Sequence, residues 1–240
     1  MILSVSAWIG TAAAQDAPLV AVADESPPFS GAALPGQGMS LDVIRTVLTE
    51  AGHPVETRVV PWARIMGDIK IGRFQIIGSL FRDPELEDAL LYADPFYVTD
   101  IQLVQRRGAG HSFTTVEALR PFAIAVGDGF LYEDEFDHAD YLKKIVVTTT
   151  LQAIRMVAVG RADLTLDSVD VIRHAITHQD PSLRTQVSFA PGVLQQQSIH
   201  MAIRRDVEGA AQIVADFNAT LAAMRADGRL DRLLERHVLQ

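Results

Sequence analysis

The sequence predicts an α/β fold with mostly parallel sheets. Segments with the apolar pattern of strands alternate along the chain with segments whose apolar residues recur every three or four positions, as in helices. The chain has 240 residues, of which 48% are hydrophobic and 21% charged, which suits one large or two small globular domains. It contains no cysteine, which excludes disulfide scaffolds, thiolate metal sites and thiol catalysis.

In the first half of the chain, the helix at residues 40–52 has the clearest pattern. Leu41, Ile44 and Val47 form its apolar face, Ser40 is the expected N-cap, and Gly52 follows its end. A Pro- and Gly-rich loop precedes it. The other elements predicted in this half are strands at 18–23, 55–60 and 74–80 and a short helix at 62–72.

The second half repeats the alternation and ends in two helices. A polar stretch with glycine and serine at 107–114 is the candidate domain boundary. No apolar run after the N-terminus reaches the roughly 18 residues that a membrane helix needs. The predicted strands lie at 122–129, 162–167, 186–191 and 198–205, and the predicted helices at 151–160, 168–178, 207–228 and 229–238.

Residues 1–14 are predicted to be a secretory signal peptide. A short apolar run, residues 2–9, precedes small residues that offer an A-x-A site, with cleavage expected between Ala14 and Gln15. The basic start of a signal peptide is missing, and the alternative is a buried N-terminal strand. The net charge of −9 disfavours a nucleic-acid partner, because no basic face is available for phosphates.

Catalytic and metal-binding patterns are weak. The chain has no G-x-S-x-G nucleophile motif. His174 and His178 stand four residues apart on a predicted helix, but a third ligand is missing nearby, so they are interpreted as surface histidines. The acidic run at 132–140 lacks the spacing and glycine of a calcium loop and is interpreted as a solvated face. We expect no metal and no cofactor.

Taken in order, several segments resemble one family. They are ESPPF, GMSLDVIRTVLTEAG, VVPWARIMGDIKIGRFQII, FRDPELEDALLYADPFY, FAIAVGDGFLYEDEF, LQAIRMVAVGRADLTLD, SIHMAIRR and MRADGRLDRLLERH. This series is similar to the periplasmic solute-binding proteins of family 3, typified by polar amino-acid receptors. The resemblance implies the type II fold of two lobes, each a mixed, mostly parallel sheet flanked by helices, with the ligand cleft between them.

The resemblance also implies the domain boundaries. Lobe 1 would comprise residues 18–104 and 200–240, and lobe 2 residues 108–196, with crossovers near 103–108 and 195–203. Opening and closing about such crossovers sequesters a solute from water.

The function implied is that of a periplasmic receptor that binds a small polar solute, amino-acid-like or anionic, and delivers it to an ABC-type permease. Relatives are commonly monomers. The absence of cysteine argues against a lipoprotein. Two alternatives stay open: a dehydratase acting on cyclic carboxylated acids, for which Glu133 is the acidic candidate, and a sensor that signals to a partner protein.

The family's carboxylate-binding residues are replaced here. Phe81 and Leu86 stand where amino-acid receptors carry a threonine and an arginine. In relatives an aspartate at the position of Ser168 binds the α-ammonium group of the ligand. Here Asp167 could take that role only if the loop is shifted by one residue. Gly129 lies in the cleft loop of lobe 2, where a following serine or threonine is also replaced.

Other residues are candidates for replacing these contacts. Arg82 could pair with a carboxylate, because a guanidinium can donate two parallel hydrogen bonds, or it could pair within its loop with Asp83 or Glu85. Arg64 is a second cationic candidate. The remaining candidates are Phe29, Trp62 and Tyr132 as stacking surfaces and Ser79 as a donor through its hydroxyl and backbone, with a core role as the alternative for Trp62.

Overall fold

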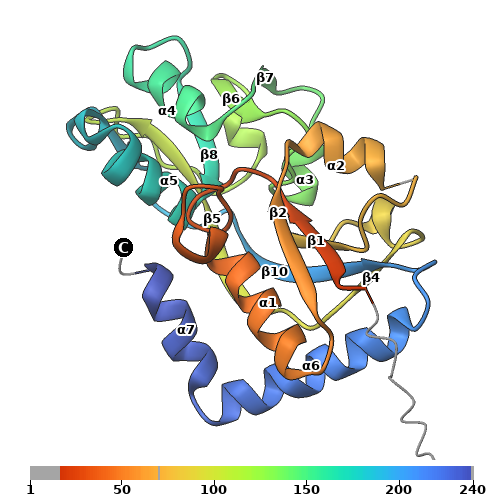
Figure 1. The fold of residues 1–240 in the computed structure, drawn as a ribbon. Coiled ribbons are helices and arrows are strands. Elements are labelled where there is room, and N and C mark those ends of the chain that lie inside the picture. Colours follow the sequence, from red (N-terminus) through yellow and green to blue (C-terminus); the bar gives the residue numbers. More distant parts are fainter. Residues whose placement is uncertain (1–16, 70, 239–240) are drawn as a thin grey trace, which may run out of the picture.

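The chain forms two lobes, each with helices packed against a sheet, and hydrogen bonds between strands connect the two sheets into one ten-stranded order (Figure 1). This computed structural model describes residues 17–69 and 71–238, so the predicted signal peptide at residues 1–14 lies outside the described residues. Within the described ranges, no helix has the length and apolar character needed to cross a membrane.

Strands and helices alternate along much of the chain, as the sequence pattern predicts, and the structure adds strands at Leu90–Tyr92 and Lys143–Val147 and a short helix at Asp134–Asp137 that were not predicted. The strands are β1 (Leu19–Ala23), β2 (Val55–Val59), β3 (Ile76–Leu80), β4 (Leu90–Tyr92), β5 (Tyr97–Arg106), β6 (Ala123–Gly127), β7 (Lys143–Val147), β8 (Leu164–Ser168), β9 (Val187–Phe189) and β10 (Gln195–Arg204). The helices are α1 (Met39–Glu50), α2 (Trp62–Asp68), α3 (Asp134–Asp137), α4 (Thr150–Ala158), α5 (Val169–His174), α6 (Ala210–Ala226) and α7 (Arg229–Val238).

The sheet of the first lobe has β1 between two parallel partners, β2 and β3. β10 then runs antiparallel to β3, with an irregular register between His200 and Ala202, and β4 pairs with β10. Helices α1, α6 and α7 pack on one another beside this sheet, while α2 contacts β1. The parallel strands β1 and β3 therefore end at the same edge of the lobe.

In the sheet of the second lobe, β8 is the central strand and β6 lies between β8 and β7. β6 is parallel to β7 and β8, whereas β5 is antiparallel to both β8 and β9. α4 packs on this sheet and contacts α5, which continues into a π-helical turn at Ala175–Gln179. β6 and β8 share an edge at their carboxyl ends, as β1 and β3 do in the first lobe.

β5 and β10 join the two sheets. Residues 195–199 of β10 pair with residues 97–101 of β5, while residues 200–204 of β10 pair with β3 and β4 of the first lobe. Residues 101–105 of β5 pair with β8 of the second lobe. Each of these ten-residue strands thus takes part in both lobes.

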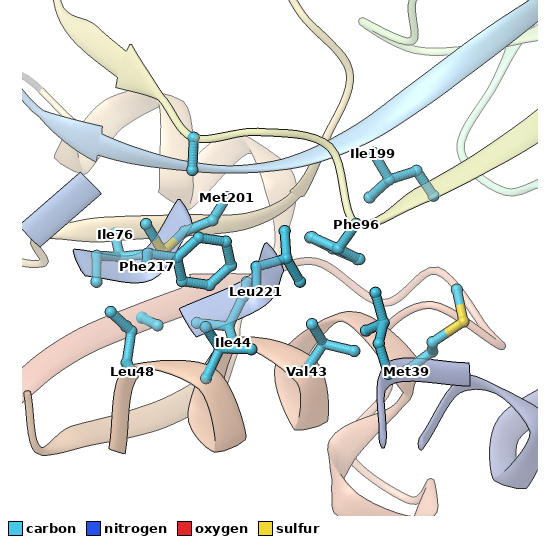
Figure 2. Packing of buried hydrophobic residues seen from close by; sticks show 14 of the residues in the cluster. Met39, Val43, Ile44, Leu48, Ile76, Phe96, Ile199, Met201, Phe217 and Leu221 are labelled. Carbon is cyan, nitrogen blue, oxygen red and sulfur yellow. The ribbon is translucent and has the colours of Figure 1, made fainter. Parts of the chain in front are cut away.

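The core of the first lobe forms where α1 and α6 meet the sheet (Figure 2). Val43, Ile44 and Leu48 of α1 pack with Phe217 of α6 and Met201 of β10, and none of these side chains is measurably exposed. Their spacing in α1 follows the helical period, so one face of the helix is buried. Burying each such side chain contributes roughly 1.5–3 kcal/mol, which holds the sheet edge in place.

The prediction that Ser40 caps α1 is wrong. Gly38 occupies the N-cap position, and the first amides of the helix donate to the carbonyls of Pro28 and Phe29 at 3.1 and 2.8 Å. The Ser40 hydroxyl is instead buried inside the first turn without a hydrogen-bond partner. Gly38 has φ +94°, and a Cβ there would meet the Phe29 carbonyl oxygen at 2.7 Å, so this close approach requires glycine.

Candidate ligand-binding site

A cavity of about 580 Å³ lies between the two lobes. Its walls come from the carboxyl ends of β1 and β3 in the first lobe and of β6 and β8 in the second, with α2, α3 and the loops between. This is the edge at which open α/β sheets bind ligands. A volume of this size suits a small organic molecule.

The first lobe contributes both apolar and polar groups to the cavity. Asp24 follows the last residue of β1, Phe29 lies in the loop beyond it, and Trp62 begins α2. Phe29 is 3% exposed and packs against the Tyr97 ring with the centroids 5.9 Å apart. Trp62 is half-buried, and its indole reaches across to the loop of the second lobe.

Ser79 lies next to the end of β3 in an unusual backbone conformation. Its φ is +60°, in the left-handed region of backbone conformations that residues other than glycine rarely adopt. Such a conformation costs roughly 1–2 kcal/mol and is concentrated at binding and catalytic sites. The half-buried Ser79 lines the cavity, so the strained backbone coincides with the site.

The second lobe holds Tyr132 rigidly. Its hydroxyl accepts a hydrogen bond from the Gly127 amide at 2.6 Å, and its own amide donates to Asp137 Oδ2 at 2.8 Å. Gln197 of β10 donates to the Tyr132 carbonyl at 2.9 Å. The ring is 3% exposed and meets Phe136 edge to face, so burial raises the pKa of the Tyr132 hydroxyl. Tyr132 therefore serves as a fixed, neutral wall.

Asp167, near the end of β8, carries the buried carboxylate of the site. Its Oδ1 accepts from the Ser168 amide at 2.7 Å, and its Oδ2 accepts from the Thr150 hydroxyl. The residue is 7% exposed, and desolvation raises the pKa of its carboxyl to about 6 despite these two hydrogen bonds. Asp24 has a raised pKa for the same reason, loss of contact with water.

Most of the predicted site residues meet at this cavity. Phe29, Trp62, Ser79, Gly129, Tyr132 and Asp167 all belong to its lining. Ser168, the counted position of the family aspartate, lines it as well, but its hydroxyl accepts from the Asp170 amide at the start of α5. Both residues therefore line the cavity, and the carboxylate that the family places at this point of the chain is present here one position earlier, at Asp167.

The two predicted cationic residues do not line the cavity. Arg82 Nε donates to Glu87 Oε1 at 2.6 Å, and its guanidinium lies 5.8 Å from the centre of the Tyr92 ring, with the side chain 63% exposed. Its neighbour Phe81 lines the cavity instead. The expectation that Arg82 faces the cleft is thus corrected: it pairs within its loop, although with Glu87 and not with the predicted Asp83 or Glu85.

Arg64 is directed to solvent from the first turn of α2. Its Nε lies 3.7 Å from Asp68 Oδ2, and its side chain is 62% exposed. Trp62 and Met66 line the cavity, and Arg64 is absent from the lining that they share. Without Arg64 and Arg82 in the lining, the expectation of an anionic solute loses its main support.

Sequence reasoning missed several lining residues. Asp24 had a usable signal, since it is the first polar residue after a buried strand and such positions face the ligand edge of α/β sheets. Met66 and Phe130 carry no such signal, because apolar residues in short helices and loops are as often part of a core. Lys144 lies inside a strand, and the pattern did not indicate which face it occupies.

Features suggesting other chemistry have structural roles. Glu133, the acidic residue considered for a dehydratase, accepts from the Phe136 amide at 2.8 Å as the N-cap of α3 and does not line the cavity. His174 and His178 lie with ring centroids 4.8 Å apart. In the ranges that the structure describes, no group of three or more potential ligand residues could hold a metal ion.

Comparison with known proteins identifies the family. Residues 19–240 match the bacterial extracellular solute-binding proteins, family 3. The chain belongs to this family. A relative from Vibrio harveyi, PatH, is named as an amino-acid ABC transporter-binding protein and is 26% identical over 203 residues, covering 82% of this chain and 78% of its own.

Several solved structures share the fold at low sequence identity. A mutant of ArgBP from T. maritima superposes with a TM-score of 0.76 at 18% identity, over 92% of this chain and 95% of its own. A histidine kinase sensor domain with similarity to periplasmic binding proteins superposes with a TM-score of 0.79 at 18% identity. The match covers 91% of this chain and 95% of the sensor domain. The GluR0 ligand-binding core from Nostoc punctiforme, in complex with L-glutamate, has a TM-score of 0.73 at 16% identity. This match covers 91% of this chain and 98% of the GluR0 core. These similarities establish the type II two-lobed fold predicted from the sequence.

Proposed function

We propose that the protein is a periplasmic receptor that binds a small polar solute between its lobes and delivers it to the permease of an ABC transporter. The observation that carries this proposal is the cavity of about 580 Å³ between the lobes, lined from both of them at the carboxyl ends of their parallel strands. Membership of the family and the name of the Vibrio harveyi relative support it.

Lobe closure is the second part of the proposal. We place the hinge in β5 and β10, because both strands take part in both sheets. The lobes correspond to residues 18–104 with 200–240 and to residues 108–196. A solute that contacts both Trp62 and Asp167 stabilises the closed arrangement, since these residues come from different lobes. The closed receptor is then the form that a permease recognises.

Thermal unfolding in the presence of a broad panel of amino acids, amines, carboxylic acids and sugars tests the receptor function. A solute at 100 times its dissociation constant stabilises the folded chain by about 2.7 kcal/mol, which raises the melting temperature by several degrees. Trp62→Ala is the matched variant, because it removes one wall of the cavity from a half-buried position. We expect the variant to unfold at a lower temperature than the wild type without solute, because Trp62 also packs against a core cluster that includes Ile65 and Leu80, and to lose the shift on adding solute. A panel in which no solute raises the melting temperature contradicts the proposal.

The partner is tested separately, because a sensor domain shares the fold. We expect crosslinking in the native membrane, with the solute present, to capture a permease subunit. Capture of a signalling protein in its place would assign the chain to ligand sensing while leaving its binding function intact.

A further inference from the structure

The ligand-binding cavity has a large excess of negative charge. Its described lining contains one cationic side chain, Lys144, and the carboxylates of Asp24, Asp83, Glu85, Asp137 and Asp167. The Lys144 Nζ donates to the main-chain carbonyl of Asp137 at 2.9 Å and lies 5.0 Å from the centre of the Phe136 ring. Its charge is therefore held at one corner, and the other charged groups of the described lining are acidic.

Asp167 is the most buried of these carboxylates. The groups that bond to its two oxygens, the Thr150 hydroxyl and the Ser168 amide, are both neutral. A buried carboxylate that ionises without a positive partner is costly, and proteins usually supply such a partner. On the side of Asp167 that faces the cavity, no described residue supplies a positive charge to the carboxylate.

Asp24 faces the same space from the other lobe. Both residues line the cavity, and the charge of Asp24 is a minor cause of the raised pKa of Asp167, after burial. The one cation of the described lining, Lys144, bonds at Asp137 and not at either of these two carboxylates. An opposite charge beside a carboxylate favours its ionised form, so a positive group in the cavity would stabilise both carboxylates.

The remaining wall is apolar and aromatic. Phe29, Trp62 and Phe130 line the cavity together with Met66 and Val171. Aromatic faces attract cations within about 6 Å and also pack against flat apolar groups. The wall therefore suits a ligand whose body is apolar and whose charge lies at one end.

We infer that the solute is an organic cation, a primary amine or guanidine attached to an apolar body, that carries no carboxylate. Its charged group lies between Asp24 and Asp167, and its body lies against Phe29 and Trp62. This inference rests on the proposed receptor function. A carboxylate on the solute would enter a cavity that offers it no arginine or histidine in the described lining and several like charges.

Two matched sets of probes test the inference by isothermal titration calorimetry at pH 8. The first set is phenethylamine, phenylalanine and 3-phenylpropionate, which share a ring and differ only in carrying the amine, both charges or the carboxylate. The second set is agmatine, arginine and 5-guanidinovalerate. All three carry a guanidine, and at the other end of the molecule they carry an amine, an amine with a carboxylate, or a carboxylate alone. We expect at least one of the two decarboxylated amines to bind at least tenfold more tightly than the amino acid and the acid of its set.

Three variants locate the charged group. Asp24→Asn and Asp167→Asn each keep the shape of the side chain while removing its charge, so each should weaken binding of the amine at least tenfold. Glu208→Gln removes one negative charge from an exposed position outside the cavity and should leave the affinity unchanged. Circular dichroism and the melting temperature of each variant without ligand establish that it is folded.

The outcomes separate the inference from the receptor function. Tighter binding of an amino acid or acid than of its amine overturns the cation inference and leaves the receptor function supported. Binding by none of the six probes also overturns the inference, while the receptor function is then decided by the broad thermal panel. Equal affinity of wild type and both aspartate variants for an amine contradicts the placement of its charge.

Discussion

The indole of Trp62 lies beside Gly129 across the cleft: a methyl group added to Gly129 would lie 3.4 Å from Trp62 Nε1, at van der Waals distance. These residues begin α2 of the first lobe and sit in the loop after β6 of the second. The contact closes one side of the cavity that both residues line. It therefore joins the two lobes at the point where a bound solute would be enclosed.

Gly129→Ala tests this contact. Gly129 has φ +69°, so an alanine there should lower the free energy of unfolding by about 1 kcal/mol. It should also weaken solute binding, because the methyl group fills the space beside the indole. Gly110→Ala is the control, since Gly110 has φ +71° with no atom within 4 Å of the added methyl group. Urea denaturation and calorimetry on both variants should show a similar loss of stability and a loss of affinity only at Gly129. Equal affinities would contradict a binding role for this contact.

Asp167→Asn should stabilise the protein without its solute at pH 8. The carboxyl pKa rises from 3.8 in the unfolded chain to about 6 in the fold, so ionisation in the native state costs about 3 kcal/mol. Asparagine avoids this cost but loses one acceptor for Thr150 or Ser168, worth about 1 kcal/mol, which leaves a net gain of about 2 kcal/mol.

The same shift sets the pH dependence of stability. Between pH 3.8 and about 6 the native state binds more protons than the unfolded state, so the stability of the wild type falls as pH rises through this window. We expect urea denaturation to show the gain of Asp167→Asn at pH 8 and none at pH 4. A gain of the same size at both pH values would assign it to packing instead of charge.

Two variants of Ser79 separate its hydroxyl from its backbone strain. Ser79→Gly removes the hydroxyl and suits φ +60°, so we expect a gain of about 1 kcal/mol in unfolding free energy. Ser79→Ala removes the hydroxyl but keeps the strain, so its stability should match the wild type. If the hydroxyl bonds to the solute, calorimetry should show both variants losing affinity by the same factor. Unchanged affinity in Ser79→Ala would limit the role of Ser79 to its backbone.

Arg82→Ala distinguishes a ligand contact from a loop contact. The exposed ion pair with Glu87 should contribute less than about 1 kcal/mol to stability. Because the guanidinium is absent from the cavity lining, affinity for the solute should change by less than twofold in calorimetry. A tenfold loss would restore the interpretation in which Arg82 grips the solute.

Much of the fold could be predicted from periodicity. The apolar face of α1 and the buried strands β3 and β6 have the patterns that burial on one or both sides produces. The N-cap was misplaced because Ser40 precedes the apolar run, whereas carbonyls of a folded loop satisfy the first amides of α1. Such contacts between the loop and the helix are tertiary, and no local pattern encodes them.

Site residues at the ends of predicted strands could be identified from the sequence. Site residues in loops were harder to identify, because the direction of their side chains depends on the folded chain. Ser79 and Asp167 lie at the ends of buried strands, and both line the cavity. Arg82 lies two residues beyond β3, where the chain leaves the extended conformation, so its direction could not be counted from the strand. The acidity of the cavity arises from residues far apart in sequence, such as Asp24 and Asp137, which only the folded chain brings together.

The most direct test is native mass spectrometry of the protein isolated rapidly from the cells that produce it, compared with its Asp24→Asn, Asp167→Asn double variant. We expect one small organic amine or guanidine bound to each wild-type chain, released on unfolding, and absent from the double variant. A wild-type chain that carries an amino acid or another carboxylic acid, or that carries no small molecule, would contradict a cleft built to hold an organic cation without a carboxylate.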